Sequence, residues 1–208
     1  METLPEELDE LPDPPYEAYR YVLSSLFPGD RILDVGCGNA KVSAYLARSG
    51  AVVDGIEPAA SRMDIARERV RHLSTLPVGE DDPNLLDEYD VITFFDVLEH
   101  LSDPTPALDW SVRRLAPSGR IIAVIPNSAH WTFRRKMLRG DWRMEDSGLF
   151  DRTHLRFYDP HTMTDLLPLG TMEVARHYFT PSKRLPSAVV QRWPALLALR
   201  AVITWRRS

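Results

Sequence analysis

Stretches of mostly apolar residues alternate along the chain with stretches of helical spacing. The apolar stretches lie at residues 31–35, 51–56, 89–95 and 120–125. The stretches with helical spacing lie at residues 16–27, 41–48, 58–70 and 104–115. Short apolar runs are typical of strands buried on both faces, and amphipathic helices between them cover such strands. The alternation therefore predicts an α/β fold with a mostly parallel sheet and helices on both faces.

The pattern changes after Pro126. Two late segments, 172–179 and 200–206, have the composition of strands, and residues 194–199 between them are expected to be helical. Two strands joined in this way can form an antiparallel pair at the edge of a sheet. Residues 71–88 are harder to interpret, and only a short strand near residues 72–75 is expected there.

The domain organisation follows from length and local composition. With 208 residues the chain is long enough for one domain with a substantial core, which we expect to span residues 16–208. Residues 1–15 are acidic and contain several prolines, so we expect a flexible lead-in. Residues 127–160 form a distinct segment rich in aromatic side chains, arginine and histidine, with an expected helix over 131–138.

Composition and charge narrow the class of protein. The formal charge of −5 and the pI of about 5.7 argue against general nucleic-acid binding. Cys37 is the single cysteine and cannot form an internal disulfide, which fits a reducing cytosol. No apolar run reaches the ~18 residues of a membrane span, and the acidic N-terminus is unlike a signal peptide. We therefore expect a cytoplasmic protein, either a monomer or a homodimer, without a membrane span.

A glycine-containing segment, DVGCGNA at residues 34–40, lies between an expected strand and an expected helix. Small residues there let the backbone approach a ligand closely. Glu57 ends the next strand about 20 residues later, the spacing of a carboxylate that binds ribose hydroxyls. A dinucleotide site would need a small residue where this chain has Lys41, and Asp34 suits a cationic ligand better. The alternative to a ligand site is that residues 34–40 form only a tight turn and that Glu57 is an exposed acid.

Three motifs together carry a family resemblance. The segments ILDVGCGNA, GIEP and YDVITFFDVLEHLSDP resemble those of class I S-adenosylmethionine-dependent methyltransferases. The resemblance implies a Rossmann-like, seven-stranded sheet whose last hairpin is antiparallel. It also implies S-adenosylmethionine as the cofactor, with the glycines under its methionine part and Glu57 on its ribose. The residues expected to contact the cofactor are Asp34, Gly36, Cys37, Gly38, Glu57, Pro58, Met63, Phe95 and Asp96.

Members of this family often have an acid after the third strand, beside the adenine. The chain offers Glu80, Asp81 and Asp82 in that region, and none of them matches the family pattern cleanly. The acid that contacts the adenine is therefore left open.

The end of the fourth expected strand carries Asp96, Glu99 and His100. A hydroxyl that accepts a methyl group must lose its proton, which requires a base or a metal ion. The spacing resembles a metal-binding set in ubiquinone-pathway O-methyltransferases and small-RNA 2′-O-methyltransferases, and His154 would supply the later histidine. That resemblance implies Mg²⁺ or Mn²⁺ on Asp96, Glu99, His100 and His154. The alternatives are His154 or His100 as a general base beside Glu99, or His154 paired with Asp151.

Residues 127–160 follow the fifth strand, where this superfamily carries its substrate cap. The elements PN, HW and DRTHLRF resemble those of a bacterial branch with MetW-like proteins and sugar O-methyltransferases. Trp131, Trp142 and Tyr158 could stack on a sugar ring, although Trp131 and Phe133 could equally pack the cap on the sheet. A basic cluster could bind a phosphate or carboxylate, or could be a solvated helix face; it comprises Arg134, Arg135, Lys136, Arg139 and Arg143.

The resulting prediction is an O-methyltransferase that acts on a hydroxyl of a small or carbohydrate substrate. One rival is an RNA-terminal 2′-O-methyltransferase, which the acidic charge disfavours. The other is a MetW-like partner protein that binds and activates another biosynthetic enzyme, against which the complete set of acids and histidines argues.

Overall fold

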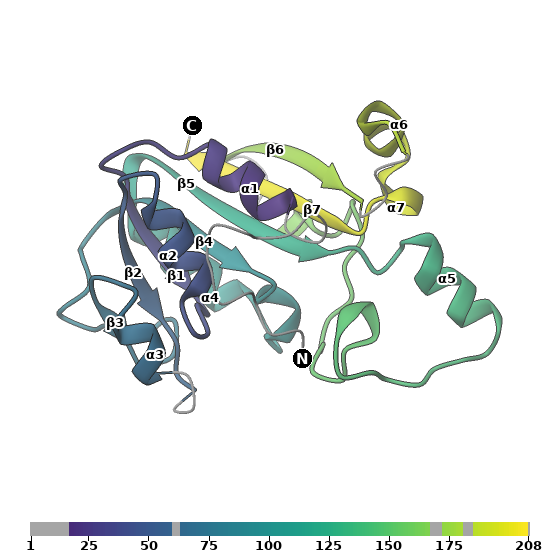
Figure 1. Ribbon diagram of the computed structural model, residues 1–208, viewed down its shortest axis with the longest axis horizontal. Coiled ribbons are helices and arrows are strands. Elements are labelled where there is room, and N and C mark those ends of the chain that lie inside the picture. The colour runs from purple at the N-terminus through teal and green to yellow at the C-terminus, as the bar shows by residue number, and fades with distance from the viewer. Residues whose placement is uncertain (1–16, 60–62, 167–171, 181–184, 208) are drawn as a thin grey trace.

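The computed structural model describes residues 17–59, 63–166, 172–180 and 185–207, and the expected lead-in at 1–15 lies outside them. The core is a seven-stranded sheet in the order β3-β2-β1-β4-β5-β7-β6 (Figure 1). Its strands are β1 (Arg31–Val35), β2 (Val52–Ile56), β3 (Leu73–Ser74), β4 (Tyr89–Phe95), β5 (Leu115–Pro126), β6 (Met172–Phe179) and β7 (Arg200–Arg207). Strands β1 to β5 pair in parallel, and β7 is antiparallel to both β5 and β6. The predicted fold class is confirmed.

Helices connect the strands and cover both faces of the sheet. They are α1 (Glu17–Ser24), α2 (Lys41–Ala47), α3 (Met63–Arg67), α4 (Thr105–Arg113), α5 (Trp131–Leu138), α6 (Ser187–Arg192) and α7 (Pro194–Leu197). Within the described residues, the short 3₁₀ turns are η2 (Leu98–His100), η3 (Gly148–Phe150) and η4 (Thr164–Leu166). In the described parts of the chain, no helix has both the length and the apolar character that crossing a bilayer requires.

The core has one apolar layer on each face of the sheet. Neighbouring strand residues divide between the layers, as the two-residue period of a strand requires: Leu33 packs with α4, whereas Ile32 packs with α1 and α2. Trp205 and Val202 divide in the same way on β7. The sheet is therefore buried on both faces, which explains its continuous apolar runs.

Most predicted elements are present, with three differences. Strand β5 begins at Leu115 and includes the Pro117–Gly119 segment that was expected to be a turn, and its register against β4 shifts between Tyr89 and Val91. This bulge absorbs the proline, which cannot donate a ladder hydrogen bond. Helix α4 consequently ends at Arg113. Helix α3 is shorter than expected, and α6 was not predicted.

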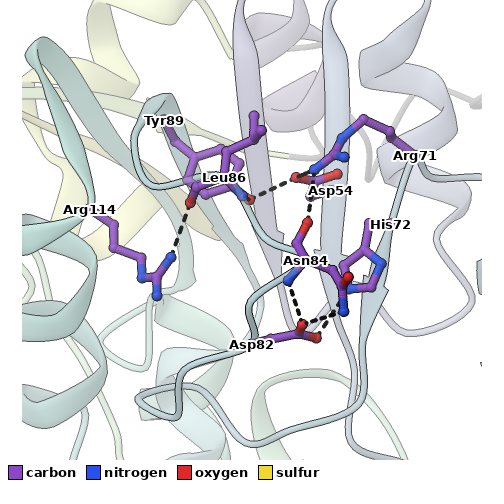
Figure 2. Close-up of polar contacts among 8 residues, drawn as sticks. All are labelled: Asp54, Arg71, His72, Asp82, Asn84, Leu86, Tyr89 and Arg114. Atoms are coloured by element: carbon purple, nitrogen blue, oxygen red, sulfur yellow. Dashed lines mark hydrogen bonds and ion pairs between the residues drawn. The ribbon is translucent and has the colours of Figure 1, made fainter.

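The segment that was hard to interpret is attached to the sheet by polar contacts (Figure 2). Asp54 on β2 is fully buried and accepts hydrogen bonds from the Tyr89 hydroxyl and from Arg71. His72 contacts Asp82 at 3.0 Å, and the Asp82 carboxylate also accepts from the Asn84 amide. Side-chain contacts with distant partners decide the path of this segment, which explains why its own hydrophobic pattern was uninformative.

The carboxyl ends of β1, β2 and β4 lie at one edge of the sheet. Strand order reverses between β1 and β4, because the chain crosses from β1 to β2 on one side and later returns to β4 on the other. Such a switch point is where open α/β sheets bind ligands. The glycine-containing segment, Glu57 and Asp96 all follow these three strand ends.

Candidate active site

The loop after β1 has the backbone geometry that its glycines permit. Gly36 has φ of 69° and Gly38 has φ of 60°, a region that residues with a Cβ rarely adopt. A Cβ on Gly36 would lie 2.7 Å from a Val97 methyl carbon, so the loop packs directly against the turn after β4. Ala40, with φ of 56°, takes the same conformation at the start of α2. The loop is therefore held in one strained path between two strand ends.

Glu57 fixes this loop from the end of β2. Its Oε2 accepts a hydrogen bond from the Gly38 amide at 2.9 Å, and its Oε1 accepts one from the Ala59 amide at 2.8 Å. The side chain is buried and still borders the cleft described next. Each carboxylate oxygen has a second lone pair, so Glu57 can also accept from a ligand hydroxyl.

A cleft of about 470 Å³ opens in front of these strand ends. Its lining residues are Val35, Gly36, Ile56, Glu57, Pro58, Pro77, Val78, Asp96, Val97, His100, Leu101 and Thr153. Four of the residues predicted for the cofactor are among them: Gly36, Glu57, Pro58 and Asp96. Pro77, Val78 and Leu101 were missed, because small apolar residues in irregular segments carry no motif.

Asp34 lies elsewhere than predicted. It is 1% exposed and does not line the cleft; its carboxylate accepts hydrogen bonds from Ser43 at 2.6 Å and from Thr93 at 2.9 Å. Burial raises the pKa of this carboxyl to about 6, although both hydroxyl groups oppose that rise. Asp34 therefore ties β1 to α2 and β4 through these two hydroxyl groups.

Gly38, Cys37 and Phe95, which were also predicted, are not among the described residues that line the cleft. The Cys37 sulfur packs behind Gly55, where a Cβ would lie 2.7 Å from it, and burial raises the pKa of the thiol. Phe95 packs edge-on against Tyr19 of α1, with ring centroids 5.1 Å apart. Met63 begins α3, and its side chain lies outside the described part of the structure.

A second, smaller cavity of about 190 Å³ adjoins the cleft. It is lined by Asp96, Glu99, His100, Pro126, Gly148, Leu149, Asp151, His154, Leu199 and Arg200. The two spaces share Asp96 and His100 as lining residues. A ligand in the large cleft and one in the small cavity would therefore meet at these two side chains.

Glu99, His100 and His154 converge in the small cavity. Each offers a ligand atom, and these atoms lie within 4.8 Å of one another. The Nε2 atom of His154 is 3.9 Å from Oε1 of Glu99, and the two imidazole rings are 4.9 Å apart. Asp96, which was predicted as a fourth ligand, is not part of this group. The predicted quartet is thus a triad among the described residues.

Backbone contacts explain how two distant segments bring these side chains together. The Glu99 carbonyl accepts hydrogen bonds from the amides of Leu155 and Arg156 at 2.8 and 3.1 Å. The Thr153 carbonyl lies 3.1 Å from Nδ1 of His100, which accordingly donates to it. This leaves Nε2 of His100 with a lone pair available for a proton or an ion.

The electrostatics of Glu99 are unusual. Its side chain is 1% exposed, and neither carboxylate oxygen has a hydrogen-bond partner among the described residues. Burial, together with the negative charge of Asp96, raises the pKa of Glu99 to about 9. Burial and the neighbouring His100 lower the pKa of His154. A carboxyl group without hydrogen-bond donors among the described residues, beside two imidazoles, is a set of ligands suited to a divalent ion.

Asp96 is held by partners that the sequence did not indicate. Arg200, at the start of β7, donates from Nε to Oδ1 and from Nη2 to Oδ2, both at 3.2 Å. The Tyr19 hydroxyl of α1 also donates to Asp96, whose backbone has φ of 51°. The register of β7, which pairs Arg200 with Pro126, brings the guanidinium to this strand end. No local motif could have identified Arg200 or Tyr19.

The cap segment contributes a packed centre and an exposed rim. Phe133 stacks on the buried Phe150, with centroids 4.4 Å apart, and Tyr158 is buried in the core; Trp131 and Trp142 are exposed. His130 is buried and caps the start of α5 by accepting from the Thr132 amide. The aromatic residues of this segment are thus divided between packing and solvent.

The acids considered for adenine recognition do not line the cleft. Asp81 pairs with Arg114 at 2.7 Å, and Asp82 contacts His72 and Asn84 (Figure 2). Glu80 is exposed. In the described chain, the side of the cleft beyond Glu57 is apolar, with Pro77, Val78 and Leu101.

Comparisons with known proteins agree with this architecture. A family model described as a methyltransferase domain matches residues 8–168. Among curated proteins, the ubiquinone biosynthesis O-methyltransferase of Aeromonas salmonicida is 28% identical over 138 residues, which cover 64% of this chain and 58% of that protein. The chain thus spans less than two thirds of that relative's length.

Solved structures share the fold. A S-adenosylmethionine-dependent methyltransferase from Thermotoga maritima has a TM-score of 0.65 and 19% identity, covering 93% of this chain and 89% of the other. The magnesium protoporphyrin IX methyltransferase of Synechocystis, with S-adenosylmethionine bound, has a TM-score of 0.58 and 15% identity, covering 92% and 76%. At these identities the likeness establishes a common fold.

Proposed function

Because the chain belongs to the methyltransferase domain family, we propose that it transfers a methyl group from S-adenosylmethionine to a hydroxyl group of a small, carbohydrate-like acceptor. The similarity to ubiquinone biosynthesis O-methyltransferases supports oxygen as the methylated atom. The exposed Trp131 and Trp142 on the cap support an acceptor with a ring on which aromatic side chains can stack.

The observation that carries this proposal is the meeting of the two cavities at Asp96 and His100. The cleft of about 470 Å³ would hold S-adenosylmethionine, with Gly36 and Glu57 in its lining. The family resemblance assigns the methionine part to the glycine loop and the ribose hydroxyls to Glu57. The acceptor hydroxyl enters the cavity of about 190 Å³ beside Glu99 and His154. Transferable methyl group and hydroxyl then face each other across the shared boundary.

The reaction is an in-line displacement, to which an enzyme contributes mainly by alignment and exclusion of water. An oxygen lone pair of the acceptor forms the new O–CH₃ bond while the S–CH₃ bond breaks, and S-adenosylhomocysteine leaves. The hydroxyl proton must be removed at the same stage. Arg200 and Tyr19 hold the Asp96 side chain in place where the two cavities meet, so Asp96 helps to align the two ligands.

The triad of Glu99, His100 and His154 would hold a divalent ion, which when bound would make the hydroxyl more acidic. The fit rests on the buried Glu99 carboxyl group, whose oxygens lack hydrogen-bond partners in the described chain. One carboxylate and two imidazoles suit Mn²⁺ better than Mg²⁺, which prefers oxygen ligands. Without an ion, neutral His154 could accept the hydroxyl proton itself.

The test is transfer of a labelled methyl group from S-adenosylmethionine to a panel of sugars, catechols and other small hydroxyl compounds. Each acceptor is assayed with EDTA, with Mg²⁺ and with Mn²⁺. We expect turnover that EDTA abolishes and Mn²⁺ restores. Turnover that is unchanged in EDTA would assign His154 as the general base. Cofactor binding without turnover, together with a stable heteromer on purification, would replace the proposal with a partner-protein function.

A further inference from the structure

The cap contains a third cavity, of about 430 Å³, that the proposed reaction does not use. Arg135 and Lys136 of α5, and Arg139 directly after the helix, line it together with Phe150. Figure 1 shows α5 projecting beyond the sheet, next to the segment that follows it. The cavity therefore belongs to the cap and not to the cofactor side of the molecule.

The charges lining this cavity do not cancel. Its two acids are already paired: Glu145 binds Lys136 at 2.7 Å, and Asp141 binds Arg143 at 2.8 Å. Arg135 and Arg139 have no ion pair with any described residue, and both are exposed. Arg135 is held only by its position 5.2 Å from the Trp131 ring.

The third cavity borders the small cavity beside the triad, because Leu149 and Leu199 line both. A molecule that extends past these two leucines would contact both spaces. A guanidinium group presents its donors in a planar fork that matches phosphate and carboxylate oxygens. Two such groups at the end of one helix form a receptor for one anionic group.

We propose that the acceptor is an anion whose phosphate or carboxylate group binds Arg135 and Arg139 while its hydroxyl group enters the cavity beside Glu99 and His154. This inference rests on the proposed methyl transfer and adds the class of acceptor. It explains why two arginines without an ion pair among the described residues line a cavity that borders the small cavity, in a chain of net charge −5.

The first test measures anion binding without turnover. Pyrophosphate is titrated calorimetrically into the full chain saturated with S-adenosylhomocysteine. The variant R135Q/R139Q should raise the Kd for pyrophosphate about ten- to one-hundredfold, because charged hydrogen bonds are lost. The control R113Q/R192Q removes the same charge from exposed residues of α4 and α6, and it should bind as the wild type does. Equal Kd values for all three proteins would overturn the proposal.

The second test compares acceptors that differ only in the anionic group, such as catechol with 3,4-dihydroxybenzoate and hexoses with their phosphates. The R135Q/R139Q variant should raise the KM of the anionic member about tenfold and leave kcat and the neutral member unchanged. Turnover of neutral acceptors that equals that of anionic ones in the wild type would reject an anionic acceptor.

The two tests separate this inference from the proposed function. If no acceptor is methylated while pyrophosphate binding still depends on Arg135 and Arg139, the methyl-transfer proposal fails and the anion site stands. If an RNA oligomer binds in a salt-sensitive way through these arginines and pyrophosphate does not bind, the small anionic acceptor is wrong.

Discussion

Two buried carboxyl groups, Asp34 on β1 and Glu99 after β4, have the same exposure and opposite surroundings. Both are 1% exposed, and burial raises the pKa of each. Ser43 and Thr93 donate to Asp34 and limit its pKa to about 6. Glu99 has no donor among the described residues and faces the charge of Asp96, so its pKa rises to about 9.

The difference distinguishes structural acids from reactive ones. An acid that joins elements acquires donors from them, as Asp34 does from α2 and β4. An acid kept without donors beside two imidazoles costs stability, and such a cost is expected where a site needs the group. The residue with the more conspicuous motif position, Asp34, is thus the structural one.

The largest expected effect comes from removing a member of the triad. H154A should lower the rate of methyl transfer by about 10²- to 10⁴-fold, because the group that assists deprotonation is lost. Urea unfolding should change little. The control H161A removes an exposed histidine from a turn outside both cavities and should be fully active. If H154A keeps more than a tenth of the wild-type activity, the assignment of the triad to the reaction is wrong.

The next largest effect concerns Arg200, the cation that pairs with Asp96. R200Q leaves the partly buried Asp96 carboxylate with the Tyr19 hydroxyl as its side-chain donor in the described part of the chain, and should lower the free energy of unfolding by about 2–4 kcal/mol. Urea denaturation measures this loss. R200K, which keeps the charge without the paired contacts, should be intermediate. Unchanged stability of R200Q would show that the ion pair does not hold Asp96.

The dependence of stability on pH should distinguish the two acids directly. The folded-state pKa of Glu99 lies above its usual value of 4.5, so wild-type stability is lost as pH rises from about 4.5 to 9. In EDTA, E99Q should therefore gain on the wild type by about 2–3 kcal/mol between pH 6 and pH 8. The advantage of D34N should stop growing above about pH 7, where Asp34, with a pKa of about 6, is almost fully ionised.

Chemical denaturation at a series of pH values measures both variants. If the stability difference between E99Q and the wild type stays constant above pH 6, Glu99 has a hydrogen-bond donor after all. If the stability difference between D34N and the wild type keeps rising above about pH 7, the two acids do not differ as proposed.

The smallest expected effect is the loss of one donor to Asp34. S43A should lower the free energy of unfolding by about 1–3 kcal/mol, since a buried carboxylate loses a hydrogen bond. The kcat of S43A should stay at least tenfold above that of H154A, because Asp34 affects the reaction only by holding the glycine-containing loop. Thermal unfolding and steady-state kinetics provide the two readouts. A loss of kcat equal to that of H154A would place Asp34 in the reaction itself.

Local pattern predicted much of the fold and part of the site. The apolar runs indicated β1, β2 and β4 closely, because strands buried on both faces have a distinctive composition. Gly36 and Glu57, predicted to contact the cofactor, both line the large cleft, since they follow strand ends that meet at one edge. Strand β5 and the segment 71–88 were predicted less well, because a bulge and distant side-chain partners shape them.

The sequence by itself determined the order of strands and helices, the glycine loop and the presence of acids and histidines after β4. Only the tertiary structure decided which of them act together. Backbone bonds from Leu155 and Arg156 to Glu99 bring His154 into the triad, and the antiparallel register of β7 brings Arg200 to Asp96. Contacts between residues 50 to 100 positions apart depend on chain packing, and no local pattern of residues encodes them.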